Sequence, residues 1–340
     1  MISYKIRFLL FFALIWNFSC QDDRDKSDFG LAYPDYFPTP HYQFGKNTLT
    51  REGFELGRAL FFDPILSVDS TISCASCHSQ GHAFADHNTA LSSGIFGKTG
   101  NRNSPAMFNL AWQPVFMWDG GINHIEVMPL APITNEVEMG EDMLKIASKL
   151  SRNPSYSKRF QRVFGEKPIE SQQIFYALAQ YMSMLVSADA KYDRYRQGKE
   201  SLSADEQDGL QIFRNKCASC HTEPLFTDFS LRNNGLEVLN DDLGFGRITL
   251  EEADNYKFKV PSLRNVVLTY PYMHDGRFRT LDQVLDHYSK GMVHHKNLDP
   301  LLMTNGQPGI LLTDTDKVKL KAFLNTLSDY TFISNPLFSE

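Results

Sequence analysis

The chain has 340 residues, of which 42% are hydrophobic, enough to form the cores of two domains. Its 34 basic and 40 acidic residues give a formal net charge of −6 at pH 7. This balance lacks the excess of positive charge that nucleic-acid-binding domains carry, so we expect no nucleic-acid partner.

The N-terminus has the pattern of an export signal. Lys5 and Arg7 precede an apolar run, FLLFFALIW, at residues 8–16, which is too short to span a bilayer comfortably. Cys20 follows at the position where a bacterial lipoprotein is cleaved and acylated, although the residues just before it depart from the usual lipoprotein pattern. We expect an exported, periplasmic protein held at the membrane by a lipid on Cys20. The alternative is that Cys20 is removed with the leader or left in a tail.

After this leader, which we assign to residues 1–20, the chain is polar and weakly patterned. Residues 21–48 contain several prolines and no clear helical or strand periodicity. We expect this segment to be a tether that ends in an ordered lead-in to the folded part.

The pentapeptide CASCH occurs twice, at residues 74–78 and 217–221. CxxCH is the attachment signature of c-type haem, in which two thiols bond the haem vinyl groups and the histidine ligates the iron. A zinc ribbon would need its CxxC pairs about 15–20 residues apart, and a thiol–disulfide motif needs no histidine. The sequence therefore predicts two covalent haem groups, bound by Cys74, Cys77, His78, Cys217, Cys220 and His221. Cys20 is the only other cysteine, so we expect no disulfide framework.

Helical patterns dominate the rest of the chain. Apolar spacing predicts a helix over residues 51–62, before the first motif, and a capping box at Ser203 and Glu206 begins another helix before the second. Loops rich in Gly, Pro and Asn occupy residues 88–105 and 233–260, and no convincing alternating strand pattern is present. Further helices are predicted over residues 141–152, 155–164, 170–187, 280–289 and 314–328.

A helix that leads into CxxCH in both halves indicates an internal duplication. We therefore predict a mostly α protein of two cytochrome c-like domains, each with one covalent c-type haem. The chain would pass from one domain to the other near residues 190–202.

Ordered sequence blocks surround the two motifs. In the first half they are LFFD at residues 60–63, SCASCH at 73–78, AFAD at 83–86, NRNSPAMFN at 101–109, WDGG at 118–121 and NEVEMG at 135–140. In the second half they are CASCH, VPSLRNV at 260–266 and TYPYMHDGRF at 269–278. Over nearly the whole mature chain, this pattern resembles the bacterial dihaem cytochrome c peroxidases, including the related methylamine-utilisation dihaem enzyme.

The resemblance implies that the two halves have different functions. Residues 49–195 would form an N-terminal peroxidatic domain whose haem reacts with hydrogen peroxide. Residues 196–340 would form a C-terminal electron-transfer domain that takes electrons from a donor and relays them.

The resemblance also assigns two catalytic residues. Glu138 matches the glutamate that moves a proton between the peroxide oxygens, and burial beside an apolar haem face would raise its pKa. Without the family, Glu138 could equally be a carboxylate near a helix N-terminus. Trp118 matches a tryptophan that bridges the haems for electron transfer. The alternative, a buried tryptophan that braces the turn at residues 119–121, is compatible with that role.

Two departures from the peroxidase pattern concern the first haem. Met128 stands where the family commonly has a glutamine, and a thioether cannot donate a hydrogen bond to peroxide. Residues 91–97 contain no histidine, whereas many members have one there that blocks the iron until the other haem is reduced. We interpret His82 and His87 as packing or propionate contacts. We therefore expect a five-coordinate N-terminal haem that reacts without reductive activation.

At the second haem, the sixth ligand is open between three residues. Tyr288 matches the family's methionine position, at which the methylamine-utilisation enzyme has a tyrosine. Tyr288 could instead be a core residue, and Met292 and Met273 are the alternative ligands. Methionine would raise the reduction potential, whereas tyrosinate favours higher-valent iron.

A calcium ion is also implied by the resemblance. Asn103, Thr269 and Pro271 match positions that hold calcium through side-chain and backbone oxygen atoms, which suit this cation. Taken alone, they are ordinary loop residues.

We predict an exported peroxidase that reduces hydrogen peroxide with electrons from a small c-type cytochrome or similar donor. A peroxide-dependent oxidase acting on a protein or small-molecule substrate is the second hypothesis, and a non-catalytic dihaem electron carrier is the third. The resemblance makes a homodimer an open expectation.

Overall fold

The computed structural model describes residues 29–86 and 89–340. The leader, the expected lipid site at Cys20 and His87 lie outside the described residues. The described part is mostly helical, as the sequence predicts. Its strands form two short antiparallel pairs, β1 (Leu231–Arg232) with β2 (Phe258–Lys259) and β3 (Met303–Thr304) with β4 (Gln307–Pro308). No helix in the described ranges is long and apolar enough to cross a membrane.

The helices of the first half surround the first and larger hydrophobic cluster. Helix α1 (Arg51–Phe62) is capped by Thr50, whose side chain accepts the backbone N–H of Gly53, and it packs along α6 (Ser171–Ser183). The helices crowd closely at Gly57, where an added Cβ would collide with the carbonyl oxygen of Ala177. The other helices of this half are α2 (Cys74–Cys77), α3 (Leu130–Thr134), α4 (Met143–Arg152) and α5 (Pro154–Phe164).

The second half repeats this construction around a separate cluster. Helix α8 (Ala204–Lys216) begins with the predicted capping box and packs along α11 (Asp314–Asn325). The close approach is at Gly209, whose added Cβ would collide with the carbonyl oxygen of Lys319. Each CASCH motif therefore follows a helix that crosses a late helix of its own cluster at a glycine.

The remaining α-helices, all in the second half, are short. Single turns of 3₁₀ helix occur in both halves. The helices are α7 (Lys191–Arg196), α9 (Gly246–Thr249), α10 (Leu281–Asp286), which continues into a π-helical turn (His287–Gly291), and α12 (Tyr330–Ile333). The 3₁₀ turns are Pro64–Leu66, Gln80–His82, Ile95–Gly97, Leu110–Trp112, Glu252–Asp254, Val266–Leu268, Pro300–Leu302 and Pro336–Phe338.

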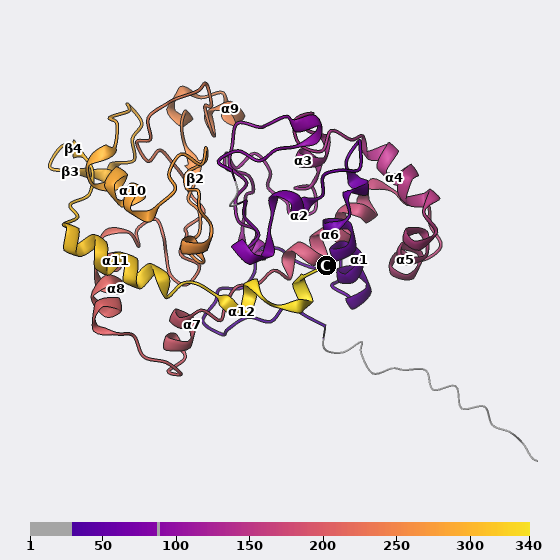
Figure 1. Ribbon diagram of the computed structural model, residues 1–340, viewed down its shortest axis with the longest axis horizontal. Coiled ribbons are helices and arrows are strands. Elements are labelled where there is room, and N and C mark those ends of the chain that lie inside the picture. Colours follow the sequence, from indigo (N-terminus) through magenta and orange to yellow (C-terminus); the bar gives the residue numbers. More distant parts are fainter. Residues whose placement is uncertain (1–28, 87–88) are drawn as a thin grey trace, which may run out of the picture.

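The end of the chain returns to the first half. In Figure 1 the yellow C-terminal segment runs from α11 through α12 and finishes beside α1 and α6. Phe332 and Phe338 are buried in the first cluster. The carbonyl of Phe338 accepts the hydroxyl of Tyr181 at 2.7 Å, and the carbonyl of Leu337 accepts Arg58 at 2.9 Å. The last residues thus complete the core that the first half begins.

Several predicted helices are shorter in the structure. The helix predicted over residues 170–187 ends at Ser183, because Ser187 is drawn into hydrogen bonds with Asn109 and Asp329. The helix predicted from residue 141 starts at Met143, where Asp142 accepts the first free N–H groups. The helices predicted to end at residues 289 and 328 end as α-helix at Asp286 and Asn325.

Candidate functional site

A cavity of about 1080 Å³ is lined by residues of both halves and by both CASCH motifs. It is larger than the roughly 300–1,000 Å³ usual for small-molecule pockets. Twelve residues to which the sequence assigns haem binding, catalysis or calcium binding as the first choice line it: Cys74, Cys77, His78, Asn103, Trp118, Glu138, Cys217, Cys220, His221, Thr269, Pro271 and Tyr288.

The first motif is a single helical turn that presents its histidine to the cavity. The His78 N–H donates to the Cys74 carbonyl at 3.0 Å. The His78 Nδ1 atom lies 2.8 Å from the carbonyl oxygen of Phe84, which is reached because Ala83 and Phe84 both adopt left-handed backbone angles. A backbone carbonyl at Nδ1 fixes the ring and leaves Nε2 to ligate a metal. Burial lowers the pKa of His78, which favours the neutral, ligating form.

The second motif is held in the same way. The His221 N–H donates to the Cys217 carbonyl at 2.9 Å. Its Nδ1 atom lies 3.2 Å from the carbonyl of Phe226 and 3.1 Å from that of Pro261, and Phe226 again has a left-handed backbone. Burial lowers the pKa of His221 as well.

The cysteines and the charged lining fit a covalently bound, anionic prosthetic group. The four motif cysteines are free thiols, and burial raises the pKa of Cys74 and Cys217 to about 12. Haem carries two propionates, which cationic side chains suit. Lys259 donates to Gln113 at 2.9 Å, and desolvation lowers its pKa to about 8. The cationic residues that line the cavity are Arg102, Lys216, Arg232, Arg247 and Lys259.

Glu138 lies in the turn between α3 and α4, with its side chain open to the cavity. Its carboxylate accepts a hydrogen bond from Asn135 Nδ2 at 2.7 Å. Because protein surrounds the cavity, desolvation raises the pKa of Glu138. Asp142, not Glu138, caps α4. The Glu138 carbonyl accepts the N–H of Ile95 at 2.8 Å, which ties this turn to the loop after the first motif.

Trp118 contacts the second half through its backbone, whereas its ring is held within the first half. Its Nε1 donates to the carbonyl of Asn103 at 2.8 Å, and its own carbonyl accepts the N–H of Lys259 at 2.7 Å. The bond to Asn103 fixes the indole at the cavity wall, and the bond from Lys259 ties the backbone of Trp118 to β2.

An ion-pair network built on two buried carboxylates adjoins Trp118, and the sequence did not predict it. Arg102 contacts Asp119 at 2.7 Å and Asp242 through two hydrogen bonds of 2.7 Å, and Arg247 also contacts Asp119. Arg102 and Asp119 belong to the NRNSPAMFN and WDGG blocks, and this membership was the only feature of the sequence that could have pointed to them. Asp242 and Arg247 lie in the long loop 233–260, where no pattern marked them.

The candidate ligands of the second haem differ in whether they line the cavity. Met273 lines the cavity with Tyr288, whereas Met292 is not among the lining residues. Asn234, which the sequence did not single out, lies 3.4 Å from Tyr288 Oη and 3.6 Å from Met273 Sδ.

The two described residues discussed for the first haem, Met128 and His82, also differ in whether they line the cavity. Met128 lines the cavity and is 9% exposed. The His82 ring packs edge-on against Tyr270, with centroids 6.3 Å apart, and His82 is not a lining residue.

The residues expected to bind calcium have other contacts as well. Asn103 Nδ2 donates to the carbonyl of Ala90 at 3.0 Å, and Thr269 Oγ1 donates to that of Val266 at 3.4 Å. Pro271 follows a cis peptide bond. Among the described residues, no group of three or more His, Cys, Asp or Glu side chains could hold a metal ion. Calcium here would therefore depend on neutral oxygens.

Comparison with known proteins decides the family. A family model described as di-haem cytochrome c peroxidase matches residues 51–201. Methylamine utilization protein MauG of Methylorubrum extorquens is 39% identical over 288 residues, which cover 83% of this chain and 79% of that protein. The chain belongs to the di-haem cytochrome c peroxidase and MauG family. It is therefore an oxidoreductase of the cytochrome c peroxidase type, and membership implies two haems.

Other relatives in this family agree. Cytochrome c551 peroxidase of Pseudomonas aeruginosa is 32% identical over 285 residues, covering 81% of this chain and 78% of that protein. The crystal structure of a MauG-like protein associated with microbial copper homeostasis matches with a TM-score of 0.83 and 31% identity, over 91% of this chain and 98% of that one. The diheme peroxidase BthA from Burkholderia thailandensis, 24% identical with a TM-score of 0.74 over 84% of this chain and 87% of that one, shares the fold.

Proposed function

We propose that this protein is an exported di-haem peroxidase that reduces hydrogen peroxide to water with electrons from a small c-type cytochrome or similar donor. The observation that carries the proposal is Glu138, a carboxyl group with a raised pKa in the cavity lined by the first CASCH motif. The overall reaction combines one hydrogen peroxide, two electrons and two protons to give two waters.

The side chains supply binding, orientation and proton transfer. Cys74 and Cys77 would bond the first haem and Cys217 and Cys220 the second, while His78 and His221 would ligate the irons through Nε2. When bound, the haems supply iron redox chemistry and store oxidising equivalents. Glu138 accepts a proton at its carboxylate from one peroxide oxygen and returns it to the other, which becomes water.

Three further residues would serve electron transfer and peroxide access. Trp118 lies at the wall of the shared cavity, which supports its role as the electron bridge. Met128 provides no hydrogen-bond donor for peroxide. Tyr288 would be the sixth ligand of the second haem, and its place in the cavity beside the second motif supports this assignment.

A second function, peroxide-dependent oxidation of a protein or small-molecule substrate, is favoured by one specific observation. Tyr288 replaces methionine at the candidate ligand position, and two methylamine utilization proteins MauG are 39% and 34% identical to this chain. Tyrosinate ligation would favour oxidised iron over electron uptake. A non-catalytic electron carrier would give no role to the carboxyl group of Glu138 in the cavity.

The proposal includes a domain organisation and a composition. Residues 49–195 and 196–340 would be the duplicated haem-bearing units. The equivalent helix pairs, α1 with α6 and α8 with α11, support this division, and residues 332–338 of the second unit pack back into the core of the first. Elemental analysis should find two irons and one calcium per chain. A single iron per chain would contradict the two haems, and the absence of calcium would contradict the calcium site.

The protein should fractionate with membranes, and Cys20→Ser should release it. An unchanged distribution of Cys20→Ser would contradict the lipid anchor. A homodimer remains part of the proposal.

Mixing the fully oxidised protein with hydrogen peroxide in a stopped-flow spectrometer tests the activity. We expect a rapid change in the haem spectrum without prior reduction, because residues 91–97 supply no histidine to block the first iron. A change seen only after reduction would contradict the open first haem. No change in either state would contradict peroxidase and oxidase functions alike. Turnover with reduced cytochrome c, compared with turnover on an organic substrate, separates those two.

A further inference from the structure

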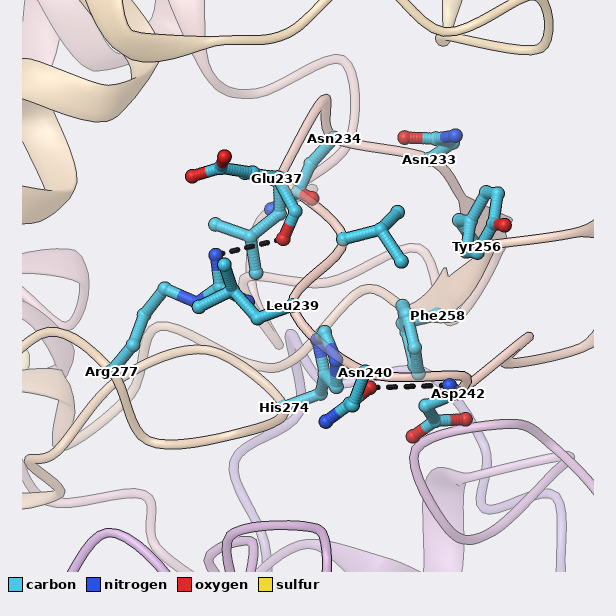
Figure 2. A pocket seen from close by; sticks show the side chains of 12 residues that line it. Asn233, Asn234, Glu237, Leu239, Asn240, Asp242, Tyr256, Phe258, His274 and Arg277 are labelled. Carbon is cyan, nitrogen blue, oxygen red and sulfur yellow. Dashed lines mark hydrogen bonds between the residues drawn. The ribbon is translucent and has the colours of Figure 1, made fainter.

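The loop that carries Asn234 is fixed in place at several points. The Asn234 carbonyl lies 3.1 Å from His287 Nε2, and the neighbouring Gly235 carbonyl accepts the N–H of Val293 at 2.7 Å. Figure 2 shows the same loop held further along, where Arg277 donates to the carbonyl of Glu237 at 2.8 Å. Asn234 is therefore presented on a preorganised segment.

The side chain of Asn234 is directed at two of the candidate ligands. One primary amide group has two N–H donors. Nδ2 lies 3.4 Å from the phenol oxygen of Tyr288 and 3.6 Å from the thioether sulfur of Met273. Tyr288 lies in the π-helical turn, and Met273 has a left-handed backbone with φ 72°. Irregular backbone of both kinds concentrates at functional sites.

We propose that Asn234 is a positioning residue that selects Tyr288, rather than Met273, as the sixth ligand of the second haem. A phenolate oxygen has enough lone pairs to accept a hydrogen bond and bind iron together, and the hydrogen bond stabilises its charged, ligating form. The thioether is a weak, neutral acceptor, and the same contact restrains it and withdraws electron density from its sulfur. This inference rests on the proposed function, since it assumes a haem at His221.

Two variants test the selection in the purified holoprotein. Asn234→Leu removes both donors at similar volume, and Asn234→Asp keeps the shape but loses the donors when ionised. For both, we expect a methionine-to-iron charge-transfer band in the oxidised spectrum and an upward shift in the reduction potential of the second haem, because methionine raises the potential relative to tyrosinate. Adding Met273→Leu to either variant should abolish the band.

Two controls delimit the result. Asn240→Ala changes an exposed residue of the same loop (Figure 2) and should leave the spectrum and potential at the wild-type values. Tyr288→Phe should change the wild-type spectrum. The inference is overturned if both Asn234 variants keep the wild-type spectrum and potential, or if Tyr288→Phe alters neither. These readouts need no peroxide, so an inert reaction with peroxide would refute the proposed function and leave this inference standing.

Discussion

Glu138→Gln should reduce peroxide turnover by about 10²–10⁴-fold, the usual contribution of a positioned acid–base group. The amide keeps the size of the side chain and its contact with Asn135, but it cannot take up and return a proton. Steady-state assays with reduced cytochrome c would measure the loss, and a haem stain would confirm that both haems are still attached.

The matched control is Glu136→Gln, which changes an exposed glutamate two residues away that does not line the cavity. Its turnover should match the wild type. If Glu138→Gln also turned over at the wild-type rate, Glu138 would not be the proton-transfer group.

The pH dependence gives an independent reading of the same group. Glu138 must begin deprotonated to accept the first proton, so activity should fall as pH falls through its pKa. Because desolvation raises that pKa, the acid limb should lie above about 4.3, the ordinary value of a glutamate. This limb should be absent from the residual activity of Glu138→Gln.

Asp193→Asn should cost about 3–5 kcal/mol of folding free energy, because it leaves the Arg264 guanidinium buried without its counter-charge. Both side chains are fully buried and form two hydrogen bonds of 2.8 Å. Asp193 also accepts the hydroxyl of Tyr36 at 2.7 Å, so the pair joins α7 to the lead-in segment and to the VPSLRNV block. Chemical denaturation of the holoprotein would measure the loss.

Two further variants separate the buried pair from a general charge effect. Glu252→Gln removes an exposed pair with Lys296 and should change stability by about 0–1 kcal/mol. Replacing both buried partners, Asp193→Leu with Arg264→Met, should cost less than the sum of the single changes, because no unpaired charge remains. An additive double variant would show that the two side chains are not coupled.

The Asp193 pair also predicts how stability responds to acid. Burial alone would raise the pKa of Asp193, but the hydrogen bonds and charge of Arg264 hold it below its ordinary value. The stabilisation is therefore complete above the unfolded pKa of about 3.9 and is lost as pH falls through the lower folded pKa. Asp193→Asn should be less sensitive to pH in this acidic range than the wild type.

Local sequence signals located the helices well where the decisive contacts are local. The helix predicted over residues 51–62 has those bounds, and the capping box of Ser203 and Glu206 is present with both hydrogen bonds. The helix ending at Ser183 was predicted four residues too long. Its true end depends on Ser187 bonding to Asn109 and Asp329, which are 78 and 142 residues away in sequence.

The same distinction applies to the site. Each CASCH motif contains its three predicted haem-binding residues within five positions, so the sequence alone is sufficient to predict all six. The contact of Asn234 with Met273 and Tyr288 joins residues 39 and 54 positions apart, and Arg102 reaches Asp242 across 140. Neither pairing leaves a periodic trace in the sequence, because each joins residues from separate segments, most of them irregular loops, that meet only in the folded chain.

The returning C-terminal segment sets an order on how this protein can mature. Phe332 and Phe338 are 2% and 6% exposed within a cluster otherwise built from the first half of the chain. This part of the core can be completed only after residues 332–338 have been synthesised and, in an exported protein, translocated. The first CASCH motif therefore emerges long before its surroundings can finish packing, which leaves its thiols accessible for the covalent haem attachment proposed above.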